Sequence, residues 1–109
     1  MGLFDFLEKQ FKNFQDNVED AQMEVKYYNE ERICNALYNL SSTSISKMVG
    51  YSQVLRKRCE YMSNENLKSI FDYAYYKRNI RACNAMMPVM SSRGLAYKNK
   101  DGKIIKMYK

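Results

Sequence analysis

The chain has 109 residues, a formal net charge of +6 and no histidine. A chain of this length forms one domain with a core of modest size. The absence of histidine removes the commonest general base and the commonest zinc ligand. We therefore expect a non-enzymatic protein that carries neither a metal ion nor a cofactor.

Cysteine usage and hydropathy bear on the compartment. The three cysteines are isolated in the sequence, and none belongs to a Cys-x-x-Cys pair; they are Cys34, Cys59 and Cys83. This pattern predicts that they are small buried apolar residues and do not form a disulfide framework. No run approaches the ~20 apolar residues of a membrane span, and the N-terminus lacks the basic and apolar segments of a secretory signal. We expect a cytoplasmic protein with no membrane partner.

Charge is unevenly distributed along the chain. Residues 1–31 carry eight Asp and Glu against three Lys, a balance of −5, whereas residues 32–109 carry fifteen Lys and Arg against four Asp and Glu, a balance of +11. Such segregation favours a polyanion or an acidic protein as the partner of the second part. The alternative is that the acidic segment packs against the basic remainder.

The clearest pattern is an apolar repeat between Leu3 and Tyr28, whose members are alternately three and four residues apart. It consists of Phe4, Leu7, Phe11, Phe14, Val18, Ala21, Val25 and Tyr28. This spacing predicts one amphipathic helix with all eight side chains on one face. At ~1.5 Å per residue the helix would be ~38 Å long, longer than a compact domain of this size is wide.

A helix of that length must protrude, bend or pack against another molecule. Its repeat is typical of a coiled-coil seam, but the seam is rich in Phe and complementary ion pairs beside it are absent. We therefore favour packing on the rest of the chain, followed by a homodimer through residues 3–28 and then by docking in a partner's groove or on a membrane surface. The candidate self-association residues are Phe4, Leu7, Phe11, Phe14, Val18 and Val25.

Further helical patterns follow. Apolar spacing resumes at Ile33 and ends near Leu40, and after a short serine-rich connection a second pattern predicts a helix over residues 45–62. Its consecutive basic residues Arg56, Lys57 and Arg58 lie largely off the apolar face. They form either a solvated surface that complements the helix dipole or a patch for phosphates.

Residues 64–87 contain the densest cluster of basic and aromatic residues. On a helix Lys77, Arg78 and Arg81 share one side, flanked by Tyr75 or Tyr76. Basic side chains beside aromatic rings are suited to nucleic-acid backbones and exposed bases, although the tyrosines also fit the spacing of a core face. Pro88 predicts that the helix stops near Met86 or that a short final helix begins there.

The C-terminal residues predict a β-hairpin. Residues 95–98 and 103–108 are the candidate strands, and Asp101-Gly102 between them is a strong turn signal because Gly supplies the positive φ that such turns need. The hairpin carries several lysines, including Lys98, Lys100 and Lys103. They form either a basic ribbon or an edge protected against aggregation.

Residues 63–109 resemble a winged helix-turn-helix domain. A capped helix from Ser63 to about Tyr75 occupies the first position, and a helix from about Asn79 to Ser92 occupies the recognition position. The latter ends in Met90-Ser-Ser-Arg-Gly94-Leu95, and the Asp101-Gly102 hairpin follows as the wing. The sequence departs from the family at Pro88 and in a turn without Gly, and its apolar pattern also permits one helix over 64–87.

The resemblance implies that Arg78 and Arg81 begin a recognition helix, which contacts the major groove, and that Lys98, Lys100 and Lys103 lie in a wing, which contacts phosphates. With the basic run of the preceding helix, the candidate nucleic-acid-binding residues are Arg56, Lys57, Arg58, Lys77, Arg78, Arg81, Lys98, Lys100 and Lys103.

Taken together, the sequence predicts a mainly α protein with a long N-terminal amphipathic helix, two or three further helices and a C-terminal β-hairpin. It forms a single domain, 1–109, in which a helical arm (1–40) precedes a basic helical part with the hairpin (41–109). The expected function is a small nucleic-acid-binding regulator. The alternative is a protein-interaction module, such as an adaptor, inhibitor or accessory factor, that uses the basic face or the N-terminal helix.

Overall fold

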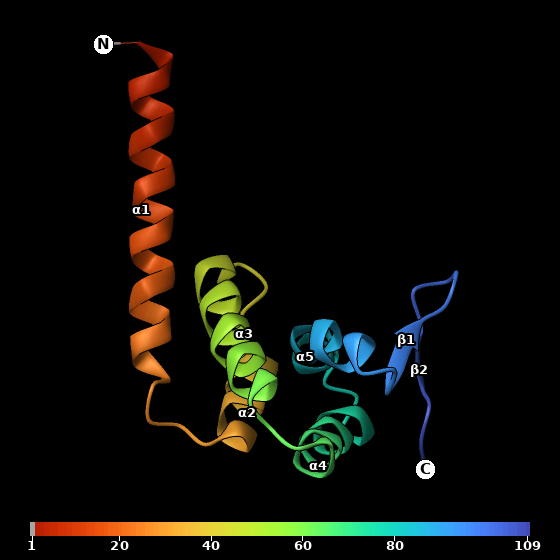
Figure 1. The fold of residues 1–109 in the computed structure, drawn as a ribbon. Coiled ribbons are helices and arrows are strands. Elements are labelled where there is room, and N and C mark those ends of the chain that lie inside the picture. The colour runs from red at the N-terminus through yellow and green to blue at the C-terminus, as the bar shows by residue number, and fades with distance from the viewer. Residues whose placement is uncertain (1) are drawn as a thin grey trace.

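The computed structural model describes residues 2–109 and contains five helices followed by a two-stranded antiparallel hairpin (Figure 1). The elements are α1 (Leu3–Glu24), α2 (Glu30–Asn39), α3 (Ile45–Glu60), α4 (Asn64–Tyr76), α5 (Ile80–Ser92), β1 (Ala96–Lys98) and β2 (Ile104–Lys106). The predicted fold class is confirmed, with four helices after the first within residues 2–109 where two or three were predicted. The first helix is shorter than predicted, because the chain turns at residues 25–27 before α2 begins. No helix in the described part of the chain is long and apolar enough to cross a membrane.

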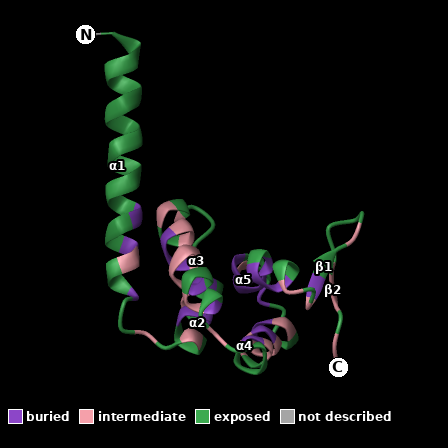
Figure 2. Ribbon diagram, in the orientation of Figure 1, coloured by how far each residue is buried: buried purple, intermediate pink, exposed green. Residues whose placement is uncertain are grey.

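Helix α1 is divided into a free half and a packed half. Residues 2–17 are all exposed, and the first buried side chain of the helix is Val18 (Figure 2). Beyond it Ala21 and Val25 are also buried, and the second half of α1 lies along α3 (Figure 1). The molecule is consequently elongated, with principal extents of 57 × 34 × 25 Å.

Gly50 of α3 sets how closely α1 and α3 approach. A Cβ atom at this position would lie 2.7 Å from the Cβ of Ala21 and 2.7 Å from the carbonyl oxygen of Val18. Real Cβ atoms do not approach other heavy atoms so closely, so only glycine fits without a shift of one helix. An ion pair between Lys47 and Glu24, at 3.7 Å, adds a polar contact across the same two helices.

One hydrophobic core joins the end of α1 to the other elements. It is built mainly from α2, α3, α4 and α5, with Ala96 of the hairpin at its edge. The largest fully buried side chains are Phe71, Ile33, Leu37, Leu55, Leu67, Met86, Met90 and Val25. All three cysteines belong to this core, as predicted, and burial raises the pKa of Cys34 and Cys59 to about 12 and that of Cys83 to about 11.

Residues 64–87 form two helices rather than one. The chain leaves α4 after Tyr76 and turns through Arg78, whose φ is +57°, before Asn79 begins α5. The side chain of Asn79 is 3% exposed; its Oδ1 accepts from the amide of Ala82, and its Nδ2 donates to the carbonyl of Cys34 at 2.7 Å. Asn79 therefore caps α5 and ties it to α2.

Helix α5 continues through Pro88 to Ser92, so the prediction that the helix would stop or restart near Pro88 is wrong. Proline cannot donate a hydrogen bond to the carbonyl four residues before it. That carbonyl belongs to Asn84, and both Asn84 and Pro88 lie on the exposed side of α5, where solvent reaches them.

The hairpin pairs Ala96 with Lys106, Tyr97 with Ile105 and Lys98 with Ile104. Its strands are shorter than predicted. Gly102 has a φ of +77°, which is the positive φ expected of the turn, and Asn99 Oδ1 accepts from the amides of Asp101 and Lys103.

Candidate nucleic-acid interface

A groove lies between the α4–α5 turn and the hairpin, and we call it the hairpin groove. It has a volume of about 740 Å³. Its lining residues are Tyr75, Tyr76, Arg78, Ile80, Cys83, Asn84, Lys98, Gly102, Lys103 and Ile104. Three segments that are separate in sequence therefore meet here: the end of α4 with its turn, the first turns of α5, and the two sides of the hairpin.

The hairpin groove is positively charged. Arg78, Lys98 and Lys103 line it, and none of its lining residues is Asp or Glu. Within residues 2–109 no carboxylate lies within ion-pair distance of these three side chains. Three cations with free donors beside one groove can therefore neutralise a bound anion.

An aromatic ring stands at the edge of the groove in a fixed position. Tyr76 is 70% exposed, yet its hydroxyl accepts from Lys106 Nζ at 2.8 Å, and the same ammonium lies 4.5 Å from the centre of the Tyr76 ring. Lys106 is itself held by Asp72, at 2.8 Å. Tyr76 thus presents a large apolar surface whose position is set by the hairpin.

Asp72 holds two residues of the C-terminal strand region at once. Besides Lys106, it accepts from the hydroxyl of Tyr108 at 2.9 Å. Desolvation alone would lower the pKa of Lys106, but its hydrogen bonds to Asp72 and Tyr76 outweigh it, so the pKa is raised. Burial, followed by the hydrogen bond to Asp72, also raises the pKa of Tyr108. Lys106 therefore stays charged and fastens the hairpin to α4 throughout the physiological pH range.

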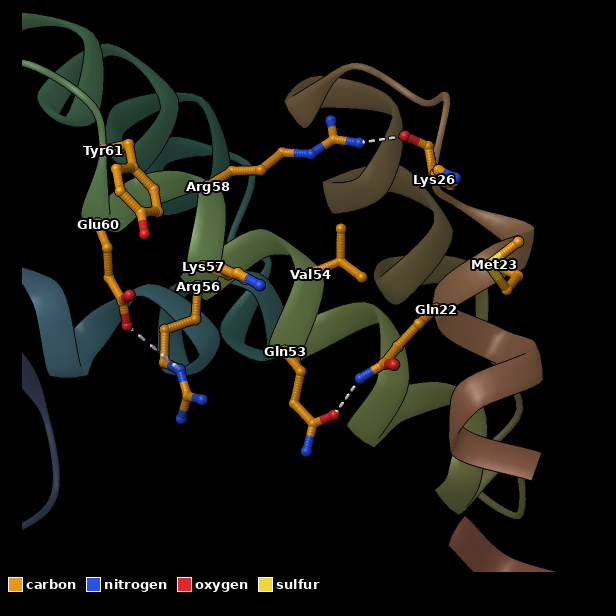
Figure 3. A pocket seen from close by; sticks show the side chains of 10 residues that line it. All are labelled: Gln22, Met23, Lys26, Gln53, Val54, Arg56, Lys57, Arg58, Glu60 and Tyr61. Carbon is orange, nitrogen blue, oxygen red and sulfur yellow. Dashed lines mark hydrogen bonds and ion pairs between the residues drawn. The ribbon is translucent and has the colours of Figure 1, made fainter. Parts of the chain in front are cut away.

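A second basic hollow of about 770 Å³ lies between the end of α1 and α3, and we call it the α1–α3 cleft (Figure 3). Lys26, Arg56 and Lys57 are among its lining residues. In the close view, Gln22 and Gln53 are joined across it by a hydrogen bond of 2.6 Å. Arg56 is partly neutralised by Glu60, 3.9 Å away.

A smaller hollow of about 370 Å³ lies between these two sites. It shares Arg56 with the α1–α3 cleft and Asn84 with the hairpin groove, and Arg81 lines it as well. The structure thereby brings most of the candidate nucleic-acid-binding residues to one series of adjoining hollows.

Two of the predicted nucleic-acid-binding arginines make structural contacts. Arg58 donates to the carbonyls of Tyr28 and Lys26, the latter at 2.7 Å, where the chain leaves α1. Arg81 donates to the carbonyls of Leu37 and Leu40, at 2.9 and 2.6 Å, at the end of α2. Their guanidinium groups therefore satisfy helix C-termini of this chain.

Of the remaining predicted residues, Lys57 lines the α1–α3 cleft, whereas Lys77 and Lys100 line none of the three hollows. Lys77 lies over the ring of Tyr73, 4.1 Å from its centre, and donates to its hydroxyl. Lys100 is exposed in the hairpin turn, and Lys57 is exposed on α3. None of these three is among the lining residues of the hairpin groove.

The predicted self-association residues are divided by the fold. Phe4, Leu7, Phe11 and Phe14 are exposed on the free half of α1, whereas Val18 and Val25 are buried in the core of this chain. We call the exposed set, together with Leu3, which flanks it, the apolar stripe; Phe6 is also exposed but points about 120° away from this face.

Sequence reasoning did not assign a role to Lys106, Arg93 or Asn84. The sequence places Lys106 in a basic hairpin, but its hydrogen bond to Asp72 joins residues 34 apart in the chain. A local sequence pattern cannot predict such a contact. Among residues 2–109 no cluster of three His, Cys, Asp or Glu could hold a metal ion.

Comparison of the chain with protein-family models, with curated proteins and with solved structures finds no significant match.

Proposed function

We propose that this chain is a small, non-enzymatic, cytoplasmic regulator that binds nucleic acid in the hairpin groove, with α1 as an arm for self-association. The observation that carries the proposal is the meeting of Arg78, Lys98 and Lys103 in a groove with no Asp or Glu among its lining residues, beside the exposed ring of Tyr76. Phosphates would contact the three cations, and an unstacked base would lie on the tyrosine.

The backbone at Arg78 supports this proposal. Its φ of +57° lies in the left-handed region, where a side chain costs about 1 kcal/mol and glycine is the preferred residue. We take an arginine in place of the preferred glycine at this position as support for a role of its side chain.

The order of elements also supports it. Helix α4, a turn, helix α5 and a hairpin follow one another as in the winged helix-turn-helix interpretation of residues 63–109. In this interpretation Asn84, exposed on α5, is suited to reading a base edge, while Arg81 is engaged with α2. Affinity would then come mainly from phosphate contacts and counterion release, so it should fall steeply with salt.

The replacement Arg78→Gly tests the proposal without endangering the fold. It removes one cation while relieving the left-handed backbone, so the free energy of unfolding should stay unchanged or rise by up to about 1 kcal/mol. Nucleic-acid affinity at low salt should fall about five- to tenfold, and the slope of log affinity against log salt should decrease by about 0.7–0.9. Fluorescence anisotropy with mixed single-stranded and duplex DNA and RNA measures both quantities.

A matched control is Lys12→Ala, which removes a cation from the exposed half of α1. It should leave affinity and salt slope close to those of the unmodified protein. If no nucleic acid binds even at low salt, or if Arg78→Gly and Lys12→Ala have equal effects, the proposal is wrong.

The apolar stripe favours the alternative, a protein-interaction module. Five large apolar side chains along one side of an exposed helix form a surface that a partner helix or groove can cover. In this alternative the basic grooves would contact an acidic protein. The two functions are separated by the same titration, because an adaptor of this kind would bind no nucleic acid at physiological salt.

A further inference from the structure

The free half of α1 is an unpartnered element. Residues 3–17 extend α1 by fifteen residues beyond its packed half, so their helical structure rests on propagation from that half and not on burial of their apolar side chains. The helix nevertheless presents the apolar stripe to solvent, with Phe4 80% exposed and Leu3 71% exposed. The structure of this half therefore calls for a surface that covers the stripe.

The stripe has the size of a specific interface. A fully exposed Phe or Leu side chain presents about 200 Å². The exposed fractions of the five side chains of the stripe then correspond to about 600 Å² for each copy. This approaches the ~800 Å² that each partner contributes to a standard protein–protein interface, and it lies at the upper end of the range for the largest apolar patch of a monomer.

The pattern of the stripe fits a second copy of the same helix. Phe4, Leu7, Phe11 and Phe14 repeat at alternate spacings of three and four, which is the repeat of a two-helix seam. The polar residues that flank the seam are largely uncharged, among them Gln10, Gln15 and Asn17, so two identical helices can approach with little like-charge repulsion.

The rest of the fold decides the direction of the second helix. The same face of α1 continues into Val18 and Ala21, and there α3 covers it, with Gly50 in close contact. In a parallel, in-register pair, the part of α1 beyond Phe14 in each copy would lie in the space that α3 of the other copy occupies, so the two copies would clash. In an antiparallel pair, the globular part of each copy lies beyond the N-terminus of the other copy, and this clash does not arise.

Antiparallel packing also covers apolar surface that α1 alone leaves open. A hollow of about 350 Å³ beside Phe14 and Val18 is closed on its other side by Val49 of α3. Ile45, at the nearby start of α3, is 53% exposed. The N-terminal residues of an antiparallel second copy would reach this region and contact both.

We propose that two copies of this chain associate through the apolar stripe as an antiparallel helix pair, with Phe4 of one copy against Phe14 of the other and Leu7 against Phe11. The inference deepens the self-association arm of the proposed function and does not depend on nucleic-acid binding. A monomeric protein would overturn it and leave the hairpin groove untouched.

Disulfide trapping tests the direction. The native cysteines are buried, with raised pKa values, and do not compete with an engineered surface cysteine. In the antiparallel pair the two copies of residue 4 are ten residues apart along the helices, or about 15 Å, and a disulfide requires Cα atoms within about 7 Å. Phe4→Cys alone and Phe14→Cys alone should therefore not cross-link, whereas an equimolar mixture of the two variants should yield a disulfide-linked dimer.

The solution mass of the unmodified protein, from sedimentation equilibrium, is the second readout and should be that of a dimer. Leu7→Ser with Phe11→Ser should give a monomer whose core stays folded, with the same midpoint of urea unfolding, because both side chains are exposed in this chain. Cross-linking of Phe4→Cys with itself would overturn the antiparallel direction. A monomeric mass at all concentrations, or a double-serine variant that remains a dimer, would overturn the interface.

Discussion

At the scale of single residues, three arginines each donate to the C-terminal carbonyls of a helix other than their own. Arg58 reaches the end of α1, Arg81 the end of α2, and Arg93 the end of α3, where it contacts the carbonyl of Met62 at 2.7 Å and that of Glu60 at 3.1 Å. Cations are favoured at helix C-termini, where carbonyl groups have no partner within the helix. A substantial part of the basic excess therefore stabilises this fold.

Replacement of Arg81 tests that role. Arg81→Ala leaves the carbonyls of Leu37 and Leu40 without their charged donor, and the free energy of unfolding should fall by about 2–3 kcal/mol in urea titrations. The control Arg56→Ala removes an exposed arginine whose ion pair with Glu60 is long, and it should cost less than about 1 kcal/mol. If both variants lose equally little free energy of unfolding, Arg81 does not stabilise the end of α2 and its guanidinium is free for a ligand.

These residues also show where sequence reasoning reaches its limit. Arg78, Arg81 and the hairpin lysines could be selected from local spacing, because neighbouring basic residues identify a basic surface. Their different roles could not be predicted in this way, because Arg81 contacts residues more than 40 positions earlier in the chain. A guanidinium that caps a distant helix and one that faces a groove are identical in sequence.

At the scale of elements, α1 combines two modes of packing in one helix. The apolar repeat predicted the helix and its apolar face correctly, but a periodic pattern does not show which part of that face is covered by the same chain. In the structure, Gly50 lets α3 pack closely against α1 at Ala21, and the residues of α1 before Val18 stay exposed. The separation of α4 from α5 has a similar origin, because Asn79 gains a buried contact with Cys34 that one continuous helix would lose.

The packing at Gly50 is directly testable. Gly50→Ala should gain helix propensity but force a Cβ against Ala21 and the Val18 carbonyl, and the net loss in the free energy of unfolding should be about 1–3 kcal/mol. Ser69→Ala, at an exposed position of α4, is the control and should change it by less than about 0.5 kcal/mol. A Gly50→Ala protein as stable as the control would show that α1 does not pack closely on α3.

At the scale of the whole molecule, charge and shape are organised along the chain. The acidic first segment forms an extended arm with an apolar stripe, and the basic remainder forms the core with its adjoining hollows. An antiparallel pair of arms would place two hairpin grooves on one particle. Two sites on one particle raise the effective affinity for a polyanion long enough to reach both.

Nucleic-acid binding in the hairpin groove can be mapped by titrating ¹⁵N-labelled protein with a short mixed-sequence single-stranded or duplex nucleic acid and following the amide chemical shifts. We expect the shifts to concentrate at residues 76–80 and around Lys98 and Lys103, while those of the free half of α1 stay in place. An absence of shifts, or shifts centred on Arg56 and Lys57 of the α1–α3 cleft, would contradict the assignment of the hairpin groove.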